Sequence, residues 1–178
     1  MPSRRLRLFA ICGAVITVLI GTAFAYSLNS SFFGQEHGRN GVMLILRGIA
    51  NERFPRGQLD DRAALEYARR VGYRGEVLDV AGNTGANSEQ VSLALARIRD
   101  DKQIAAIYGF SGGGYNVRAI WTQLTDEEKE RIRKVVIIGS PGVGEADFPD
   151  VQEVIIKKDP PAGHLAGPKA LLDELDRS

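Results

Sequence analysis

Five short apolar runs alternate with amphipathic stretches along most of this chain. The runs that are typical of buried strands lie at 41–46, 76–80, 104–108, 135–138 and 154–156. The segment 61–71 separates the first two runs and repeats apolar residues at helical spacing. Strands that alternate with helices are characteristic of α/β folds with a parallel sheet. The pattern therefore predicts an α/β three-layer sandwich with a mostly parallel five-stranded sheet.

Capping signals mark further helices. Glu89 opens a helical pattern that runs through Arg99, and Asn87 or Ser88 is its expected N-cap. Thr125 to Glu128 has the sequence of a capping box and predicts a short helix. Two more helices are expected from 112 to about 124 and at 166–176.

The N-terminal segment differs from the rest of the chain. Arg4, Arg5 and Arg7 precede an uncharged stretch, of which residues 8–28 are long enough to cross a bilayer. Ala23-Phe24-Ala25 also fits the small-residue pattern before a signal-peptidase site. We therefore expect residues 1–25 to be a cleaved signal peptide, or a retained membrane anchor that contacts the membrane through 8–28.

Both interpretations of this segment place the rest of the chain outside the cytoplasm, in the periplasm or the extracellular space, because the arginines stay inside. A buried core helix fits this segment less well, because the basic flank stands on the side expected of an exported or anchored protein. Residues 26–40 have no hydrophobic period and are interpreted as a linker, which leaves 41–178 as the folded domain.

Composition excludes several classes of function. Without residues 1–25 the chain carries 20 Lys and Arg against 22 Asp and Glu, a net charge of −2, so no nucleic-acid partner is expected. Cys12 lies inside the apolar segment, and the exported domain therefore has no disulfide. Two histidines far apart in sequence make a poor ligand set, and we predict no metal and no cofactor.

The strongest chemical signal follows the third apolar run. That run leads into Gly109-Phe110-Ser111-Gly112-Gly113, and a helical pattern begins directly afterwards. Gly-x-Ser-x-Gly between a strand and a helix predicts a nucleophile elbow, in which a tight turn lifts the serine hydroxyl out of the backbone. The N–H of Gly112, at the start of a helix, suits a developing oxyanion.

Other rim loops are expected to complete a site, because ligands of parallel sheets bind beyond the carboxyl ends of the strands. A second oxyanion donor is expected from the loop after the first strand, at Gly48 or Ile49. The residues predicted as substrate contacts are Arg47, Asn51, Thr84 and Phe110. Arg47 and Asn51 suit ordinary loop structure at least as well, and Thr84 suits a turn or cap equally well.

A serine nucleophile needs a base, and the chain has two histidines. His37 lies in the linker, whereas His164 follows the last strand, at the sheet edge where Ser111 is expected to emerge. His164 is therefore the predicted base, although the position also suits a helix cap. Asp159, five residues earlier, is the first choice for the orienting acid, and it also suits a turn before proline. The alternatives for this acid are Glu145, Asp147 and Asp150.

These features resemble the α/β-hydrolase superfamily, near its small, lidless, cutinase-like members. The resemblance covers 41–178 and rests on Gly109–Gly113 after the middle strand and on Asp159 and His164 after the last. It implies a sheet of order 2-1-3-4-5 and a triad of Ser111, His164 and Asp159 that cleaves esters. The chain differs from the family in its shorter Asp-to-His spacing and in Arg47-Gly48, which stands where His-Gly is customary.

The sequence therefore predicts an exported serine hydrolase that cleaves an ester or thioester through an acyl-enzyme on Ser111. The alternative is a non-catalytic domain on the same scaffold, whose Gly109–Gly114 loop binds an anion or whose surface binds an envelope partner. That loop lacks the Gly-Lys-Ser/Thr ending of a nucleotide phosphate loop. A hydrolase cannot lose His164, whereas a binding domain can.

Overall fold

The computed structural model describes residues 38–48, 58–78, 80 and 88–177. The chain divides into two compact units, Met1–Glu36 and His37–Ser178, and the described residues belong to the second unit. The predicted signal peptide or anchor and most of the predicted linker lie outside the described residues. Among the residues described, no helix is both long enough and apolar enough to cross a membrane.

The described strands form one parallel sheet, of order β2-β1-β3-β4-β5. Both the α/β class and the strand order implied by the resemblance are confirmed. Because β3 is the middle strand, its carboxyl end lies at the centre of the sheet edge. The strands are β1 (Val42–Leu46), β2 (Arg74–Leu78), β3 (Ile104–Phe110), β4 (Lys134–Ile138) and β5 (Glu153–Lys157).

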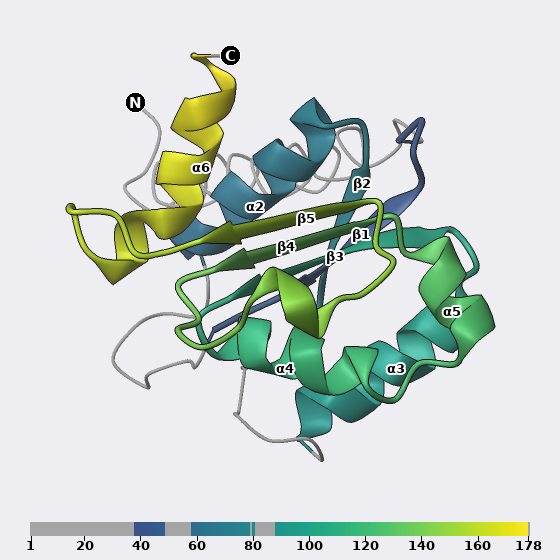
Figure 1. Cartoon of the computed structure of the whole chain (residues 1–178). Helices are drawn as coiled ribbons and strands as arrows, with labels where there is room; N and C mark the ends of the chain where they lie inside the picture. The colour runs from purple at the N-terminus through teal and green to yellow at the C-terminus, as the bar shows by residue number, and fades with distance from the viewer. Residues whose placement is uncertain (1–37, 49–57, 79, 81–87, 178) are drawn as a thin grey trace, which may run out of the picture. The chain divides into compact units, whose positions relative to one another are not determined.

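Helices cover both faces of this sheet. On one face lie α2 (Gln58–Arg70) and α6 (Gly167–Leu175), as Figure 1 shows. The opposite face is covered by α3 (Glu89–Asp100) and α4 (Gly112–Trp121), with α5 (Asp126–Arg131) following α4 along the chain. The predicted three layers are present, and the predicted element ends differ by a few residues. Two 3-10 helices, η1 (Glu145–Asp147) and η2 (His164–Ala166), were not predicted.

Alternation along β1 divides the interior into two cores. Val42, Leu44 and Leu46 pack toward α3 and α4, whereas Met43 and Ile45 pack toward α2 and α6. All five side chains are at most 2% exposed. Full burial of an aliphatic side chain contributes roughly 1.5–3 kcal/mol, so a strand buried on both faces needs a continuous apolar run.

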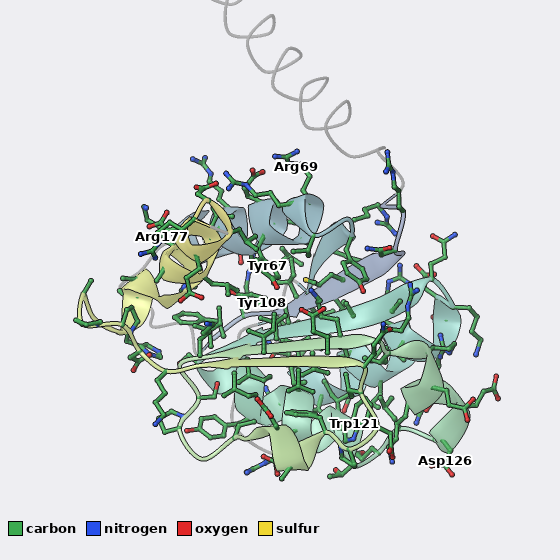
Figure 2. The ribbon with its side chains drawn as sticks, turned by 45° about the horizontal axis from the view of Figure 1, so that its top comes forward. Tyr67, Arg69, Tyr108, Trp121, Asp126 and Arg177 are labelled. Atoms are coloured by element: carbon green, nitrogen blue, oxygen red, sulfur yellow. The ribbon has the colours of Figure 1, made fainter. Side chains whose placement is uncertain are left out.

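Aromatic residues fill the space between the sheet and its helices. Tyr67 of α2 and Tyr108 of β3 lie with ring centroids 6.4 Å apart on one face, and both are labelled in Figure 2. On the other face Trp121, at the end of α4, meets Phe148 edge to face at 5.9 Å. The first pair joins α2 to β3, and the second joins the end of α4 to the segment between β4 and β5.

Side-chain caps start two helices where the sequence predicts them. Ser88 Oγ accepts a hydrogen bond from the Val91 N–H at 3.3 Å and caps α3. Thr125 and Glu128 form the reciprocal pair of a capping box at the start of α5, at 3.2 and 2.9 Å. Both predicted caps are confirmed, with Ser88 as the cap of α3.

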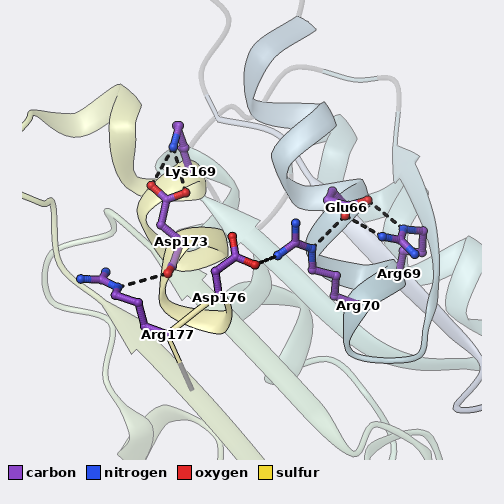
Figure 3. A network of polar contacts seen from close by, with 7 residues as sticks. All are labelled: Glu66, Arg69, Arg70, Lys169, Asp173, Asp176 and Arg177. Carbon is purple, nitrogen blue, oxygen red and sulfur yellow. Dashed lines mark hydrogen bonds and ion pairs between the residues drawn. The ribbon is translucent and has the colours of Figure 1, made fainter.

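Charged side chains join α2 to α6 (Figure 3). Arg70 contacts Glu66 on its own helix and Asp176 just beyond α6, and Arg69 also donates to Glu66. Hydrogen bonds from Arg69 and then Arg70 lower the pKa of Glu66 from 4.5 to about 2. The network attaches the C-terminal helix, which follows His164, to α2.

A Glu66→Gln variant tests this network through its pH dependence. The folded-state pKa of Glu66 is lowered, so its contribution to the free energy of unfolding is present above about pH 4.5 and lost as pH falls toward 2. We expect the variant to be about 0.5–1 kcal/mol less stable near neutral pH, because the network is largely exposed, and to approach the stability of the wild type as pH falls through about 2. Urea unfolding at several pH values measures the difference.

Glu130→Gln, at an exposed glutamate of α5, is the matched control and should show no such pH-dependent loss. A stability difference between Glu66→Gln and wild type that stays constant with pH would contradict the ionic origin of the effect.

Candidate active site

Ser111 lies at the junction between β3 and α4 in a conformation that is rare for residues other than glycine. Its φ is 53° and its ψ is −120°. A Cβ at Gly109 would lie 2.7 Å from the Gly114 Cα, and one at Gly113 would collide with the Leu46 carbonyl oxygen. The strand and the helix therefore meet backbone to backbone. This is the strand–turn–helix geometry of a nucleophile elbow.

Hydrogen bonds hold the strained turn in place. The Ser111 N–H donates to the Ile138 carbonyl at 2.8 Å, which fixes the turn against β4. The Ser111 carbonyl accepts from the Gly114 N–H at 3.0 Å and from the buried Ser140 hydroxyl at 2.7 Å. The Ser111 side chain makes no capping bond to α4, unlike Ser88 at the start of α3. Its hydroxyl is thus not committed to holding the helix.

Ser140 has a role that the sequence does not reveal. Ser140 follows β4, and a hydroxyl bonded to the carbonyl of a residue 29 positions away leaves no local sequence pattern. Its contact with the elbow depends on β4 lying beside β3.

The loop that begins at Arg47, after β1 (the β1 loop), lies beside Ser111, as the predicted oxyanion site requires. A Cβ at Gly48 would lie 3.0 Å from Ser111 Cβ and 3.2 Å from the Phe110 carbonyl oxygen, so only glycine fits there without displacing its neighbours. Gly112 is the first residue of α4 and presents its N–H at the helix N-terminus. Three predicted residues, Ile49, Asn51 and Thr84, lie outside the described residues.

The loop between β5 and α6 brings His164 and Asp159 together. His164 Nδ1 lies 2.7 Å from Asp159 Oδ1. The five-residue spacing closes through a turn in which the Gly163 N–H donates to the Pro160 carbonyl at 2.9 Å. With Asp159 at Nδ1, the ring's other nitrogen, Nε2, is left on the opposite edge for proton transfer.

Two neighbours place this pair over the sheet edge from which Ser111 emerges. Phe110, the residue before Ser111, is buried and stacks on His164 with ring centroids 4.9 Å apart and planes inclined by 24°. Gly139 follows β4, and a Cβ there would lie 2.6 Å from Asp159 Oδ1 and 2.7 Å from His164 Cε1. Phe110 is predicted from the sequence as a substrate contact, and in the structure it packs against the His164 imidazole.

The alternative acids lie in the segment after β4. Asp147 Oδ2 accepts a hydrogen bond from the Gly144 N–H at 2.9 Å within η1. Glu145 and Asp150 are exposed, and Asp150 adopts a positive φ of 68°. Of the four candidate carboxylates, the structure pairs Asp159 with His164. In the part of the chain that is described, His, Cys, Asp and Glu form no group of three that could hold a metal ion.

Arg47, another predicted substrate contact, binds a carboxylate of α2. Its Nε donates to both carboxylate oxygens of Asp61 at 3.0 Å, and the two side chains are largely buried. A planar guanidinium against a carboxylate is a specific pairing. The Arg47 side chain thus anchors the β1 loop to α2.

Comparison with known proteins shows a likeness in structure but none in sequence. No known protein family matches this sequence, and no curated protein does. A Trichoderma reesei cutinase, solved in complex with a C11Y4 phosphonate inhibitor, is similar with 16% sequence identity and a TM-score of 0.44. The similarity covers 84% of this chain and 77% of the cutinase chain. We therefore infer the chemistry from the residues of the site.

A Gly139→Ala variant tests whether this glycine makes room for the Asp159–His164 pair. We expect the added methyl group to displace both side chains, because its position lies within 2.9 Å of atoms of each. Nitrogen-15 NMR of histidine should show a changed His164 signal, with the His37 signal as an internal reference.

Gly142→Ala is the matched control, since Gly142 also has a positive φ but its Cβ position has no atom within 4 Å. Both variants should lose about 1–2 kcal/mol of stability from backbone strain. An unchanged His164 signal in Gly139→Ala would contradict the close packing.

Proposed function

We propose that this domain is a serine hydrolase that cleaves ester or thioester bonds. Ser111 is the nucleophile, His164 the base and Asp159 the acid that orients it. The observation that carries the proposal is the convergence of an elbow serine and an Asp–His pair, with the histidine stacked on the residue next to that serine. The three residues come from two distant parts of the chain.

Acylation uses the Ser111 hydroxyl, the His164–Asp159 pair and the backbone N–H groups beside the serine. Ser111 Oγ attacks the carbonyl carbon while His164 Nε2 accepts the hydroxyl proton. Asp159 accepts a hydrogen bond from Nδ1–H, which fixes the ring tautomer and stabilises the imidazolium that forms. The carbonyl electron pair moves onto oxygen, and this oxyanion is bound by the Gly112 N–H and by the backbone of the Gly48 loop.

The tetrahedral intermediate then collapses to an acyl-enzyme. The C–O or C–S bond of the substrate breaks, and the leaving alcohol or thiol takes the proton from His164. A water molecule attacks the acyl carbon while His164 again accepts a proton. Breakdown of this second intermediate releases the acid and returns the proton to Ser111.

A fluorophosphonate probe tests the nucleophile. The wild-type protein should be labelled on Ser111, because a serine activated by a neighbouring base attacks the phosphorus of the probe and displaces fluoride, which leaves a phosphonyl group on the serine. Ser111→Ala should abolish labelling, as measured by mass spectrometry of the folded protein. Ser88→Ala is the matched control: it also removes a serine hydroxyl at a helix N-terminus, but one that only caps α3, and labelling should persist.

A folded wild-type protein that stays unlabelled would contradict the hydrolase and favour the alternative binding domain. Titration with inorganic phosphate would then test the Gly109–Gly114 loop as an anion site.

Substitutions of the other two residues test their roles. His164→Ala and Asp159→Asn should each lower kcat for a short-chain p-nitrophenyl ester by about 10³-fold or more. Asp150→Asn is the control for the acid, because asparagine tolerates the positive φ at that position, and it should leave kcat within about twofold. A mild loss in Asp159→Asn, with a large loss in Glu145→Gln or Asp147→Asn, would reassign the acid.

We also propose that the enzyme acts outside the cytoplasm. The support is the basic N-terminus followed by the apolar stretch 8–28. The intact mass of the protein from cell fractions tests this: a start at Tyr26 indicates a cleaved signal, and a retained Met1 in the membrane fraction indicates an anchor. Full-length protein in the soluble cytoplasmic fraction would contradict both.

A further inference from the structure

Gln90 is a fully buried polar side chain on α3, and it lies among apolar neighbours that pack on the sheet. Its Nε2 donates to the Val80 carbonyl at 2.8 Å and to the Arg47 carbonyl at 3.2 Å. Its Oε1 accepts from Asn116 Nδ2 at 2.8 Å. One amide thus connects the segments that follow β1 and β2 with the interior of α4.

Packing alone does not account for an amide at this position. A buried polar group costs free energy unless it is hydrogen-bonded, so an aliphatic residue would serve helix packing equally well. Gln90 instead uses both ends of its amide, and each bond reaches a different element of the fold. Directional hydrogen bonds of this kind fix the relative positions of the segments that they join more specifically than apolar contacts do.

The connected segments are those expected to form the oxyanion site. Arg47 precedes Gly48, whose backbone lies against Ser111. Asn116 lies on α4, the helix that begins at Gly112. Gln90 therefore joins the loop that carries one expected donor to the helix that carries the other.

Arg47 is held from two directions. Its carbonyl is bonded by Gln90 on the side of α3, and its guanidinium is bonded by Asp61 on α2. Helices on the two opposite faces of the sheet thus fix the same residue at the carboxyl end of β1.

We propose that Gln90 is a positioning residue that sets the Gly48 loop against the N-terminus of α4, so that their N–H groups meet the same oxyanion. This role rests on the proposed hydrolase function. Loss of the tether lets the Gly48 loop move relative to Ser111. A misplacement of about 1 Å at a reacting centre can cost about 100-fold in rate.

Gln90→Leu tests the proposal. We expect kcat for a p-nitrophenyl ester to fall about 10- to 100-fold with KM little changed, because the oxyanion exists only after attack on the carbonyl. The rate of fluorophosphonate labelling should fall in parallel. Hydrogen exchange measured in peptides that span 42–48 should become faster, while exchange in α6 should stay as in the wild type.

Two further variants complete the design. Ile98→Val, at another fully buried position of α3, controls for a general loss of core packing and should leave kcat and exchange at 42–48 near wild type. Asn116→Asp is the nearly isosteric second test. An ionised aspartate cannot donate to Gln90 Oε1, so at a pH where residue 116 is ionised the amide should turn its Nε2 toward that residue and away from the two carbonyls.

Each outcome decides the proposal. Slower turnover together with faster exchange at 42–48, in Gln90→Leu or Asn116→Asp but not in Ile98→Val, supports it. Unchanged exchange at 42–48, or a kcat equal to that of Ile98→Val, overturns it. A wild-type protein without turnover or labelling overturns the proposed function and the catalytic role of Gln90 together, and exchange still decides whether Gln90 holds the loop.

Discussion

The hydrogen bond between Asp159 and His164 is the interaction on which the proposed chemistry depends. It forms in the loop after β5, yet it lies at the carboxyl ends of β3 and β4, where Gly139 leaves space for both side chains. Phe110 stacks on the imidazole and sets the plane of the ring. The residue before Ser111 therefore also helps to orient His164.

The rest of the site is held from both faces of the sheet. On one face, Asp61 of α2 binds Arg47 in the loop after β1. Arg70 of the same helix binds Asp176, just beyond α6, the helix that follows His164. On the other face Gln90 binds the β1 loop and α4. The connections to Arg47 act on the residue next to Gly48, whereas the strained backbone at Ser111 is held by the Ile138 carbonyl and the Ser140 hydroxyl.

The fold is predictable from sequence because central strands must be apolar on both faces, and β1, β3 and β4 stand out as continuous runs. The edge strand β2 is only partly buried, and its Arg-Gly-Glu start gives a weaker signal, which explains its shift from 76–80 to 74–78. Contacts between side chains that are distant in the sequence were not predictable. Nothing local links Arg47 to Asp61, and spacing alone could not choose among four candidate acids.

The most direct test is a crystal structure of the protein after reaction with a phosphonate. The account predicts phosphorus bonded to Ser111 Oγ, a phosphonyl oxygen on the Gly112 N–H, and His164 Nε2 at about 2.6–3.2 Å from an oxygen of the adduct. An adduct on another serine, or an imidazole directed away from the phosphonyl group while still bonded to Asp159, would contradict it.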